Sequence, residues 1–555
     1  MPEQHKFIDM HIHLFTARYL PLHGIFRSFG AINWLARGLA RFAVSITGMD
    51  DLDSSPRLAF SSNVLRALQG QSADGLMNAI AARSRELLIK YQSSTTENEA
   101  EEESARLLLR AIDDLNSGLF PVQHAKRPAS SRIMFDAEIR QGSAFDGTGT
   151  TPDHLDTILA QGFALAAEAL SENDFFDDAA HLHSESHFEK RTYDGLRSAG
   201  LTPRDLGIIG QLLVFIGTMV LSEHDRYQAL EDDYADGKPS NGVDADKYVG
   251  ILLDMHHAYV EVFSQDLDPP YFDFKRQIRR MKALAALRGV ELISFGSVDP
   301  FRGPRKCLEN VDYGVEQGVE GFKLYPPLGY RAFESNNYVT AVNPAAQRAD
   351  KYEDLAENPA PTQHAQDAMN VIIQHFSKCK LRLFAHCNPK GFQVKQGYGI
   401  FSDPEHWRQG MEEFDAKDLR LFLAHGGGTM DVDWHGWAAA TDEDFEKSFA
   451  YRAVRLAQTH RNVYLGLGHI LDVFDADNHD VIRQRLVSLL NAPQPVGTSY
   501  AISQKLCYGS DWNMPRMIGK TRKYLSAFYR IFDDPKLRPF AQDFFKDNAD
   551  RFLNS

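Results

Sequence analysis

Short apolar runs alternate with amphipathic segments through the second half of the chain. Seven runs of strand length lie at 248–254, 291–298, 319–325, 381–386, 419–425, 462–467 and 505–511. Between them, apolar residues recur at helical spacing in the segments 274–288, 304–317, 364–379, 403–414, 443–459 and 476–490. This alternation predicts a series of βα units and therefore a parallel sheet.

An eighth strand is predicted at the N-terminus, where residues 6–13 alternate with a period of two. The apolar side chains at positions 8, 10 and 12 are expected on one face, and Asp9, His11 and His13 on the other. Eight βα units favour a closed (β/α)₈ barrel of the TIM type over an open doubly wound sheet. The predicted fold class is α/β.

Between the first two strands the pattern becomes helical, as at 99–115 and 155–171. The predicted domains are therefore a barrel of residues 1–15 and 245–555 and a large helical insertion at 16–244. Because the insertion follows the HxH residues, it leaves the barrel at the end where reactive groups gather. We expect it to form a lid, a specificity wall or an oligomer interface, so a homo-oligomer is left open.

Polar side chains with metal-binding chemistry stand where the strands end. The first strongly polar groups after the apolar runs are His11 and His13, Lys323, His386, His425 and Asp511. Since the carboxyl ends of barrel strands meet at one face, these groups are expected to converge there. Histidine and carboxylate ligands suit zinc or a similar divalent ion, which makes hydroxide available at neutral pH. Asp511 can both bind the ion and accept a proton from water.

Composition narrows the class of protein. The 555 residues exceed one minimal domain, and 43% hydrophobic with 24% charged residues is typical of a globular protein. The net charge of −15 argues against a nucleic-acid-binding surface. The four cysteines contain no CxxC pair, and neither a signal peptide nor a membrane-spanning run is evident. We therefore expect a cytoplasmic protein that acts on a small-molecule substrate, without a nucleic-acid or membrane partner.

Several motifs resemble, in order, the strand motifs of the amidohydrolase superfamily. They are FIDMHIHLF, DPFRGPRK, GFKLYPPLGYRAF, LFAHCNP, LFLAHGGG, NVYLGLGH and YGSDWNMP. The similarity is greatest to the second amidohydrolase family, the predicted TIM-barrel metal-dependent hydrolases, whose last helix also resembles the closing KDNADRFLNS. It covers residues 5–15 and about 245–555, and it leaves 14–244 unmatched.

The resemblance implies roles for the strand-end residues. His11, His13 and Asp511 would bind a first metal ion, and His386 would be a ligand from strand 5. His425 would bind a second ion or polarise the bound water or substrate. The segment FKLYP is similar to the strand-4 motif of dihydroorotases, in which a carboxylated lysine bridges two metals. Lys323 would either do the same or bind a substrate carboxylate unmodified, so one or two ions are implied, zinc before manganese.

The predicted function is hydrolysis of a C–N or C–O bond in an amide, cyclic amide, lactone or ester, with Asp511, His425 and Lys323 as catalytic residues. A metal-dependent non-oxidative decarboxylase is the alternative, and a binding or assembly module with a vestigial site is a third. Candidate substrate contacts beyond the strand ends are Tyr325, Arg331, Arg302, Trp434 and His469.

Three further features remain open at this point. Asp9 would either fix a histidine tautomer or serve as a strand cap or surface carboxylate. Gly426–Gly428 favours close approach of backbone to the metal centre over a phosphate loop, because GK[ST] does not follow. The histidines at 181, 183 and 187 are interpreted as a solvated face.

Overall fold

The structure, a computed structural model, describes the N-terminal strand, the end of the predicted insertion and most of the remaining chain. The described residues are 6–28, 40, 44, 47, 219, 221–235, 245–263, 267–287, 290–333, 363–389, 393–394, 398–428, 436–517 and 521–554. The helices predicted at 99–115 and 155–171, the histidines at 181–187 and Trp434 lie outside these residues.

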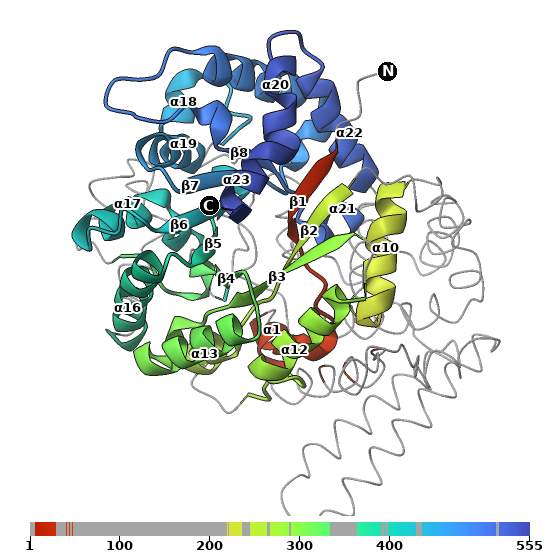
Figure 1. Ribbon diagram of the computed structural model, residues 1–555, viewed down its shortest axis with the longest axis vertical. Helices are drawn as coiled ribbons and strands as arrows, with labels where there is room; N and C mark the ends of the chain where they lie inside the picture. The colour runs from red at the N-terminus through yellow and green to blue at the C-terminus, as the bar shows by residue number, and fades with distance from the viewer. Residues whose placement is uncertain are drawn as a thin grey trace, which may run out of the picture.

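Eight parallel strands form one sheet in sequence order, as the apolar runs predict (Figure 1). They are β1 Phe7–Ile12, β2 Ala245–Ile251, β3 Glu291–Ser297, β4 Gly321–Leu324, β5 Arg382–His386, β6 Arg420–Ala424, β7 Val463–Leu467 and β8 Leu506–Tyr508. The two edges meet just beyond β8, where the Asp511 N–H donates to the His11 carbonyl at 2.8 Å. The sheet is thus a (β/α)₈ barrel, and the predicted fold class is confirmed.

Helices surround the sheet at the predicted places. They include α12 Phe274–Ala285, α13 Pro304–Glu316, α16 Gln363–Cys379, α17 Pro404–Glu413, α20 Ala476–Asn491 and α22 Thr521–Phe532. The single helix predicted at 443–459 is wrong in one respect, because the structure has α18 Asp442–Glu446 and α19 Phe449–Thr459 instead. Ser448 separates them: its side chain accepts from the Tyr451 N–H and so caps the start of α19.

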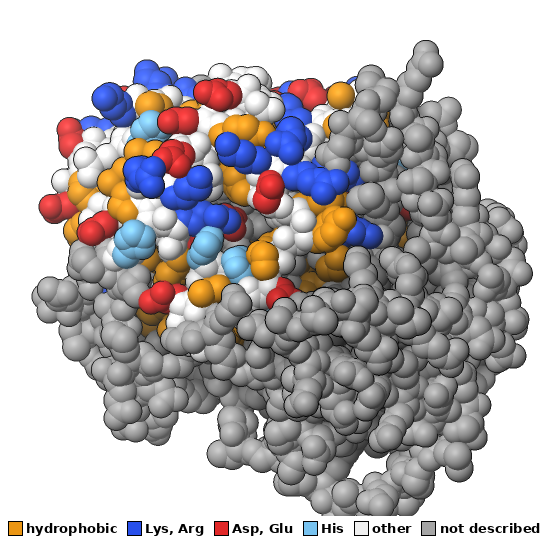
Figure 2. All heavy atoms as spheres, turned by 90° about the horizontal axis from the view of Figure 1, so that it is seen from below, with side chains coloured by type: hydrophobic (Ala, Val, Ile, Leu, Met, Phe, Trp, Pro, Cys, Tyr) orange, Lys and Arg blue, Asp and Glu red, His pale blue; other side chains and the backbone are white. Residues whose placement is uncertain are grey.

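Short elements connect the strands and helices. They are η1 Ala17–Tyr19, α1 Leu22–Ser28, α11 His256–Phe263, η4 Pro300–Arg302, η5 Pro326–Leu328, η7 Tyr398–Ser402, η8 His425–Gly427, η9 Leu471–Phe474, η10 Ile502–Gln504, α21 Asn513–Met517, η11 Arg538–Phe540 and η12 Asp543–Asp547. Exposed helix faces carry ion pairs such as Arg305–Glu309 and Arg408–Glu412. Figure 2 likewise shows acidic and basic side chains side by side on one face.

The helix α10, Glu223–Ala235, stands in the outer layer beside β1 and β2 (Figure 1). On one side, Arg280 of α12 bonds to Glu223 at 2.6 Å. On the other, Thr521 of α22 donates to Asp233 at 3.1 Å. In the ring of helices, α12 follows the second strand and α22 follows the last. Because α10 lies between these two helices, it takes the position of the barrel's first helix. The end of the predicted insertion therefore completes the helical layer.

A β-bulge in β1 changes which side chains face the barrel interior. Two steps along β2 match three steps along β1, because Asp9 pairs with Tyr248 and Ile12 with Gly250. The extra residue breaks the period of two, so side chains beyond the bulge change sides. His11 therefore contacts the interior ring of Phe384, whereas Asp9 faces the outer layer. The prediction that Asp9 shares a face with His11 is wrong for this reason.

The barrel interior is filled with apolar side chains below the strand ends. Ile8, Met10, Phe295, Phe384 and Phe422 are members of this inner cluster. The last helix, α23 Asn548–Asn554, adds Phe552, whose ring centroid lies 5.3 Å from that of Phe422. Filling this end restricts access to the opposite end, where the polar residues lie. In the described residues no helix is long and apolar enough to span a bilayer.

Candidate metal centre

Three predicted ligands form a compact triangle at the meeting point of β1 and β8. The Nε2 atoms of His11 and His13 lie 3.1 Å apart. Asp511 Oδ1 lies 3.7 Å from the first and 3.4 Å from the second. All three residues are buried, at 2%, 7% and 9% exposure. Donor atoms bound to one ion at about 2.1 Å are separated by about 3–3.5 Å, so the triangle fits a single divalent ion.

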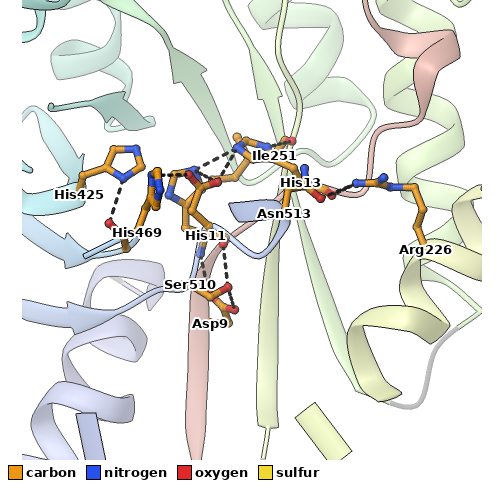
Figure 3. Close-up of polar contacts among 11 residues, drawn as sticks. Asp9, His11, His13, Arg226, Ile251, His425, His469, Ser510 and Asn513 are labelled. Atoms are coloured by element: carbon orange, nitrogen blue, oxygen red, sulfur yellow. Dashed lines mark hydrogen bonds and ion pairs between the residues drawn. The ribbon is translucent and has the colours of Figure 1, made fainter. Parts of the chain in front are cut away.

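Backbone carbonyls fix the ring tautomers of two histidines. His13 Nδ1 lies 3.0 Å from the Ile251 carbonyl, and His425 Nδ1 lies 3.0 Å from the Gly468 carbonyl (Figure 3). Because a carbonyl only accepts, each Nδ1 carries the proton and each Nε2 keeps its lone pair. Burial lowers the pKa of His13 to about 3, so its ring is neutral, as a ligand must be. Carbonyl support of this kind is usual behind metal-binding histidines.

His425 joins the triangle from β6. One donor atom each from His11, His425 and Asp511 lies within 4.8 Å of the others. The ring centroid of His386, at the end of β5, lies 4.6 Å from that of His425. The structure therefore brings all five predicted His and Asp residues to one end of the barrel, with His11, His13 and Asp511 packed most closely.

Asp9 supports this cluster from behind. Its Oδ1 accepts the N–H of His11 at 3.1 Å and of Ser510 at 2.8 Å. Its Oδ2 accepts the Tyr234 hydroxyl at 2.6 Å and the Ser510 hydroxyl. Asp9 thus accepts hydrogen bonds from backbone on both sides of the β1–β8 junction. These contacts are neither those of a surface carboxylate nor those of a group that fixes an imidazole tautomer. Burial raises the pKa of Asp9, and the hydrogen bonds that its carboxylate accepts oppose this shift.

The opposite side of the mouth is formed by β4 and β5. Lys323 Nζ is buried, and among the described residues it has no hydrogen-bond partner. It lies 4.6 Å from the centroid of the Phe384 ring. Burial lowers the pKa of Lys323 to about 7, although Asp511 opposes the shift. Tyr325 packs on His386, with ring centroids 4.5 Å apart.

Three consecutive strands are followed by a non-glycine residue in the left-handed region. The φ angles are +61° at His425, +57° at His469 and +55° at Asp511. This conformation is costly for ordinary residues and is concentrated at functional sites. It turns three polar side chains, from β6, β7 and β8, toward the same mouth.

His469 belongs to this cluster, and the sequence pointed to it only weakly. Its Nδ1 lies 3.9 Å from Asp511 Oδ2, and its ring centroid lies 6.2 Å from that of His425. Its Nε2 is buried, with no hydrogen-bond partner among the described residues. In Figure 3 the ring lies between His425 and His11. The signal was the same as for His425, a histidine after an apolar run, but it comes two residues past the end of β7.

The glycines after β6 serve packing. A Cβ on Gly427 would lie 2.1 Å from the Ala450 nitrogen of α19, and one on Gly428 would lie 2.4 Å from Asn388 Oδ1. Both have positive φ angles. These glycines let the loop pass close to α19 and Asn388, and the interpretation that they bring backbone to the metal centre stays a prediction.

Two of the candidate substrate contacts already have partners. Arg302 forms a bidentate ion pair with Asp254, with distances of 2.6 and 2.9 Å. The Arg331 guanidinium lies 5.0 Å from the Phe401 ring centroid. Asp254 offsets the charge of Arg302, which weakens the case for Arg302 as a contact to an anionic group.

Comparison with known proteins gives weak similarity in structure alone. No family model matches the chain, and no curated protein matches it. Among solved structures, a zinc-bound amidohydrolase from Burkholderia multivorans has 13% identity and a TM-score of 0.36, covering 61% of this chain and 91% of its own. The chain resembles amidohydrolases and decarboxylases alike.

The similar decarboxylases match to the same degree. A 5-carboxyvanillate decarboxylase from Novosphingobium aromaticivorans, with bound manganese, has 10% identity and a TM-score of 0.35, covering 66% of this chain and 93% of its own. A 2,6-dihydroxybenzoate decarboxylase from Rhizobium has 10% identity and a TM-score of 0.32, covering 60% and 89%. The strand order and the site geometry above are independent of these similarities.

Proposed function

We propose that this protein is a metal-dependent hydrolase that cleaves a C–N or C–O bond of a small amide, cyclic amide, lactone or ester. The observation that carries the proposal is the triangle of His11 Nε2, His13 Nε2 and Asp511 Oδ1, with edges of 3.1–3.7 Å. Zinc is the ion we expect, with manganese as the alternative. A bound divalent ion would polarise the substrate carbonyl and make water acidic enough to attack at neutral pH.

The protein's own groups would direct the proton and the substrate. Asp511 has a second carboxylate oxygen, Oδ2, on the side of His469. It would accept the proton of the attacking water as the new C–O bond forms. The same proton then passes to the leaving nitrogen or oxygen as its bond to the acyl carbon breaks. His425 Nε2, its lone pair directed inward, would hold the water or the ion beside it.

Substrate contacts are proposed around this centre. Tyr325, which packs on His386, and Arg331, whose guanidinium lies over the Phe401 ring, are the first candidates. Arg302 remains a candidate of second rank, because Asp254 already binds it. His469 is a further candidate, because its buried Nε2 has no partner among the described residues and would bind a polar atom of the substrate.

Lys323 would take one of two roles. As a carbamate it would bridge two ions, the second held by His386 and His425. Unmodified, its ammonium would bind a substrate carboxylate. The second role also favours decarboxylation as an alternative function. There the C–C bond to a carboxylate would break, CO₂ would leave with the bonding electrons staying on the substrate carbon, and Asp511, protonated beforehand by solvent, would donate its proton to that carbon.

Metal content per chain tests the proposal and separates these roles. The protein is expressed with zinc or manganese, kept in bicarbonate and measured by plasma mass spectrometry, beside Lys323→Ala. About two ions, falling in the variant, would support the bridging carbamate and hydrolysis. About one ion, unchanged in the variant, would leave His425 as a catalytic residue and give decarboxylation equal standing. Protein that retains no metal and turns over neither ester, lactone and amide panels nor hydroxybenzoates would refute the proposal.

A further inference from the structure

The helix α10 reaches both strands that supply the candidate triangle. Arg226, in its first turns, is fully buried. Its Nη2 donates to the His13 carbonyl and to Asn513 Oδ1, both at 2.7 Å. Figure 3 shows the side chain extending from α10 to these two acceptors. One guanidinium therefore ties the end of β1 to the segment after β8.

Two more contacts come from the same face of α10. About two turns further on, Asp233 accepts the Trp512 indole N–H at 2.8 Å, and the Tyr234 hydroxyl donates to Asp9 at 2.6 Å. Residues seven and eight apart lie on one side of a helix. This side of α10 thus contacts the neighbours of His11, His13 and Asp511 and leaves the ligand side chains untouched.

The junction of β1 and β8 is already joined without Arg226. Asp9 bonds to Ser510, and the Asp511 N–H bonds to the His11 carbonyl. What Arg226 adds is a fixed separation between two ligand segments, His13 on one side and the residues following Asp511 on the other. Metal sites tolerate errors of only about 0.2 Å in ligand distance, so such a link bears directly on affinity.

We propose that Arg226 is a positioning residue of the candidate metal site: by bonding the His13 carbonyl and Asn513 together, it sets the spacing of His13 and Asp511. This inference rests on the proposed function, because it assumes that the triangle binds a metal ion. Arg226 remains cationic near neutral pH although burial lowers its pKa to about 9. A cation is the appropriate donor here, since it bonds more strongly to neutral oxygens than an uncharged group does.

The test compares Arg226→Met with Arg280→Met in the full-length protein. Arg280 is also buried and also bonds to α10, through Glu223, and its guanidinium lies over the Phe272 ring. Zn²⁺ affinity is measured by competition with a chromogenic chelator, and thermal unfolding is followed on metal-free protein. We expect Arg226→Met to weaken Zn²⁺ binding about 10–100-fold, as loss of groups that orient ligands does. Arg280→Met should lower the unfolding temperature at least as much while leaving Zn²⁺ affinity within about threefold.

Three further variants and a spectrum complete the test. Asn513→Ala removes one acceptor and should weaken Zn²⁺ binding in the same direction. If a methionine variant does not fold, Arg226→Lys and Arg280→Lys replace the pair, and an intermediate loss is expected only for Arg226→Lys. In Co²⁺-substituted protein, Arg226→Met should change the visible absorption band, which follows ligand geometry.

The outcomes separate the two proposals. Wild-type Zn²⁺ affinity in Arg226→Met, or an equal loss in Arg280→Met, would overturn the positioning role while leaving the metal site in place. If the wild-type protein itself binds neither Zn²⁺ nor Mn²⁺, the proposed function fails and the positioning role fails with it.

Discussion

The two sides of the barrel mouth are supported in different ways. On the β1–β8 side, which carries His11, His13 and Asp511, Asp9 alone accepts bonds from three residues, and Arg226 links the two segments. On the β4–β5 side, the Lys323 ammonium lies over the Phe384 ring, and His386 packs on the rings of Tyr325 and His425.

This difference suggests a division of labour. Hydrogen bonds to charged groups hold atoms to fixed positions, and a metal site needs that precision. Ring contacts fill space and leave polar atoms such as Lys323 Nζ available to something that arrives later. We therefore expect the β1–β8 side to hold its geometry before a ligand binds and the β4–β5 side to adjust to the ligand.

The largest expected effect on turnover comes from a substitution on the β1–β8 side. Asp511→Asn removes both a charged ligand and the proposed proton acceptor, so kcat should fall by about 10³-fold. The measurement is steady-state turnover on the best substrate of the panel, with circular dichroism to check the fold. Turnover equal to wild type would show that Asp511 has neither role.

Asp9→Asn should lower both the stability of the β1–β8 side and its affinity for metal. An amide accepts fewer of the bonds now made to Asp9, so metal-free protein should lose about 3 kcal/mol of unfolding free energy. Zn²⁺ affinity should fall about 10–100-fold. Asp403→Asn is the control, because Asp403 is equally buried but pairs with Arg452 away from the site. A loss of Zn²⁺ affinity in both variants would mean that any buried aspartate matters equally.

His469→Asn tests the boundary between the two sides. Asparagine tolerates a positive φ, so the backbone should be retained while the imidazole is lost. We expect kcat/KM to drop about 10–100-fold with metal content unchanged, as for loss of a contact to the reacting substrate. His460→Asn, at the end of α19, should stay within about twofold of wild type. Loss of metal from His469→Asn would instead make this residue a ligand.

The smallest expected effect is a gain in stability. Lys323→Met should raise the unfolding free energy of metal-free protein by about 1 kcal/mol, because a buried polar group without a partner is costly. Lys505, also buried, donates to the Arg461 carbonyl. Lys505→Met should therefore lower that free energy by about 1 kcal/mol in urea unfolding. Equal destabilisation by both would remove the distinction between the two sides.

Much of the barrel was predictable because its strands obey simple rules. The strands after β1 follow the predicted apolar runs, and a polar residue at the end of a run marks the carboxyl end, which places His386, His425 and Asp511 together. Periodicity failed at β1, since the bulge between Asp9 and Ile12 inserts a residue that no count of alternation detects.

The support behind the site was not predictable from local pattern. Arg226 and His13 are 213 positions apart, and nothing around Arg226 distinguishes it from other charges on a helix. The pairing of Arg302 with Asp254 likewise depends on how two loops meet. The sequence pattern therefore indicated Arg302 as a candidate but did not predict its ion pair with Asp254. His469 also follows an apolar run, but it lies two residues past the end of β7, so the strand-end rule indicates it less directly than His425.

The junction of β1 and β8 also sets an order for biosynthesis. Asp9 and Ser510 are 501 positions apart, so the first strand made must wait for the last. At roughly 5–20 residues per second, that interval is roughly 25–100 s on the ribosome. The triangle cannot assemble before Asp511 emerges, long after His11 and His13. Metal would therefore load only once β8 has been made, and a product truncated before Asp511 would carry two histidines without their carboxylate.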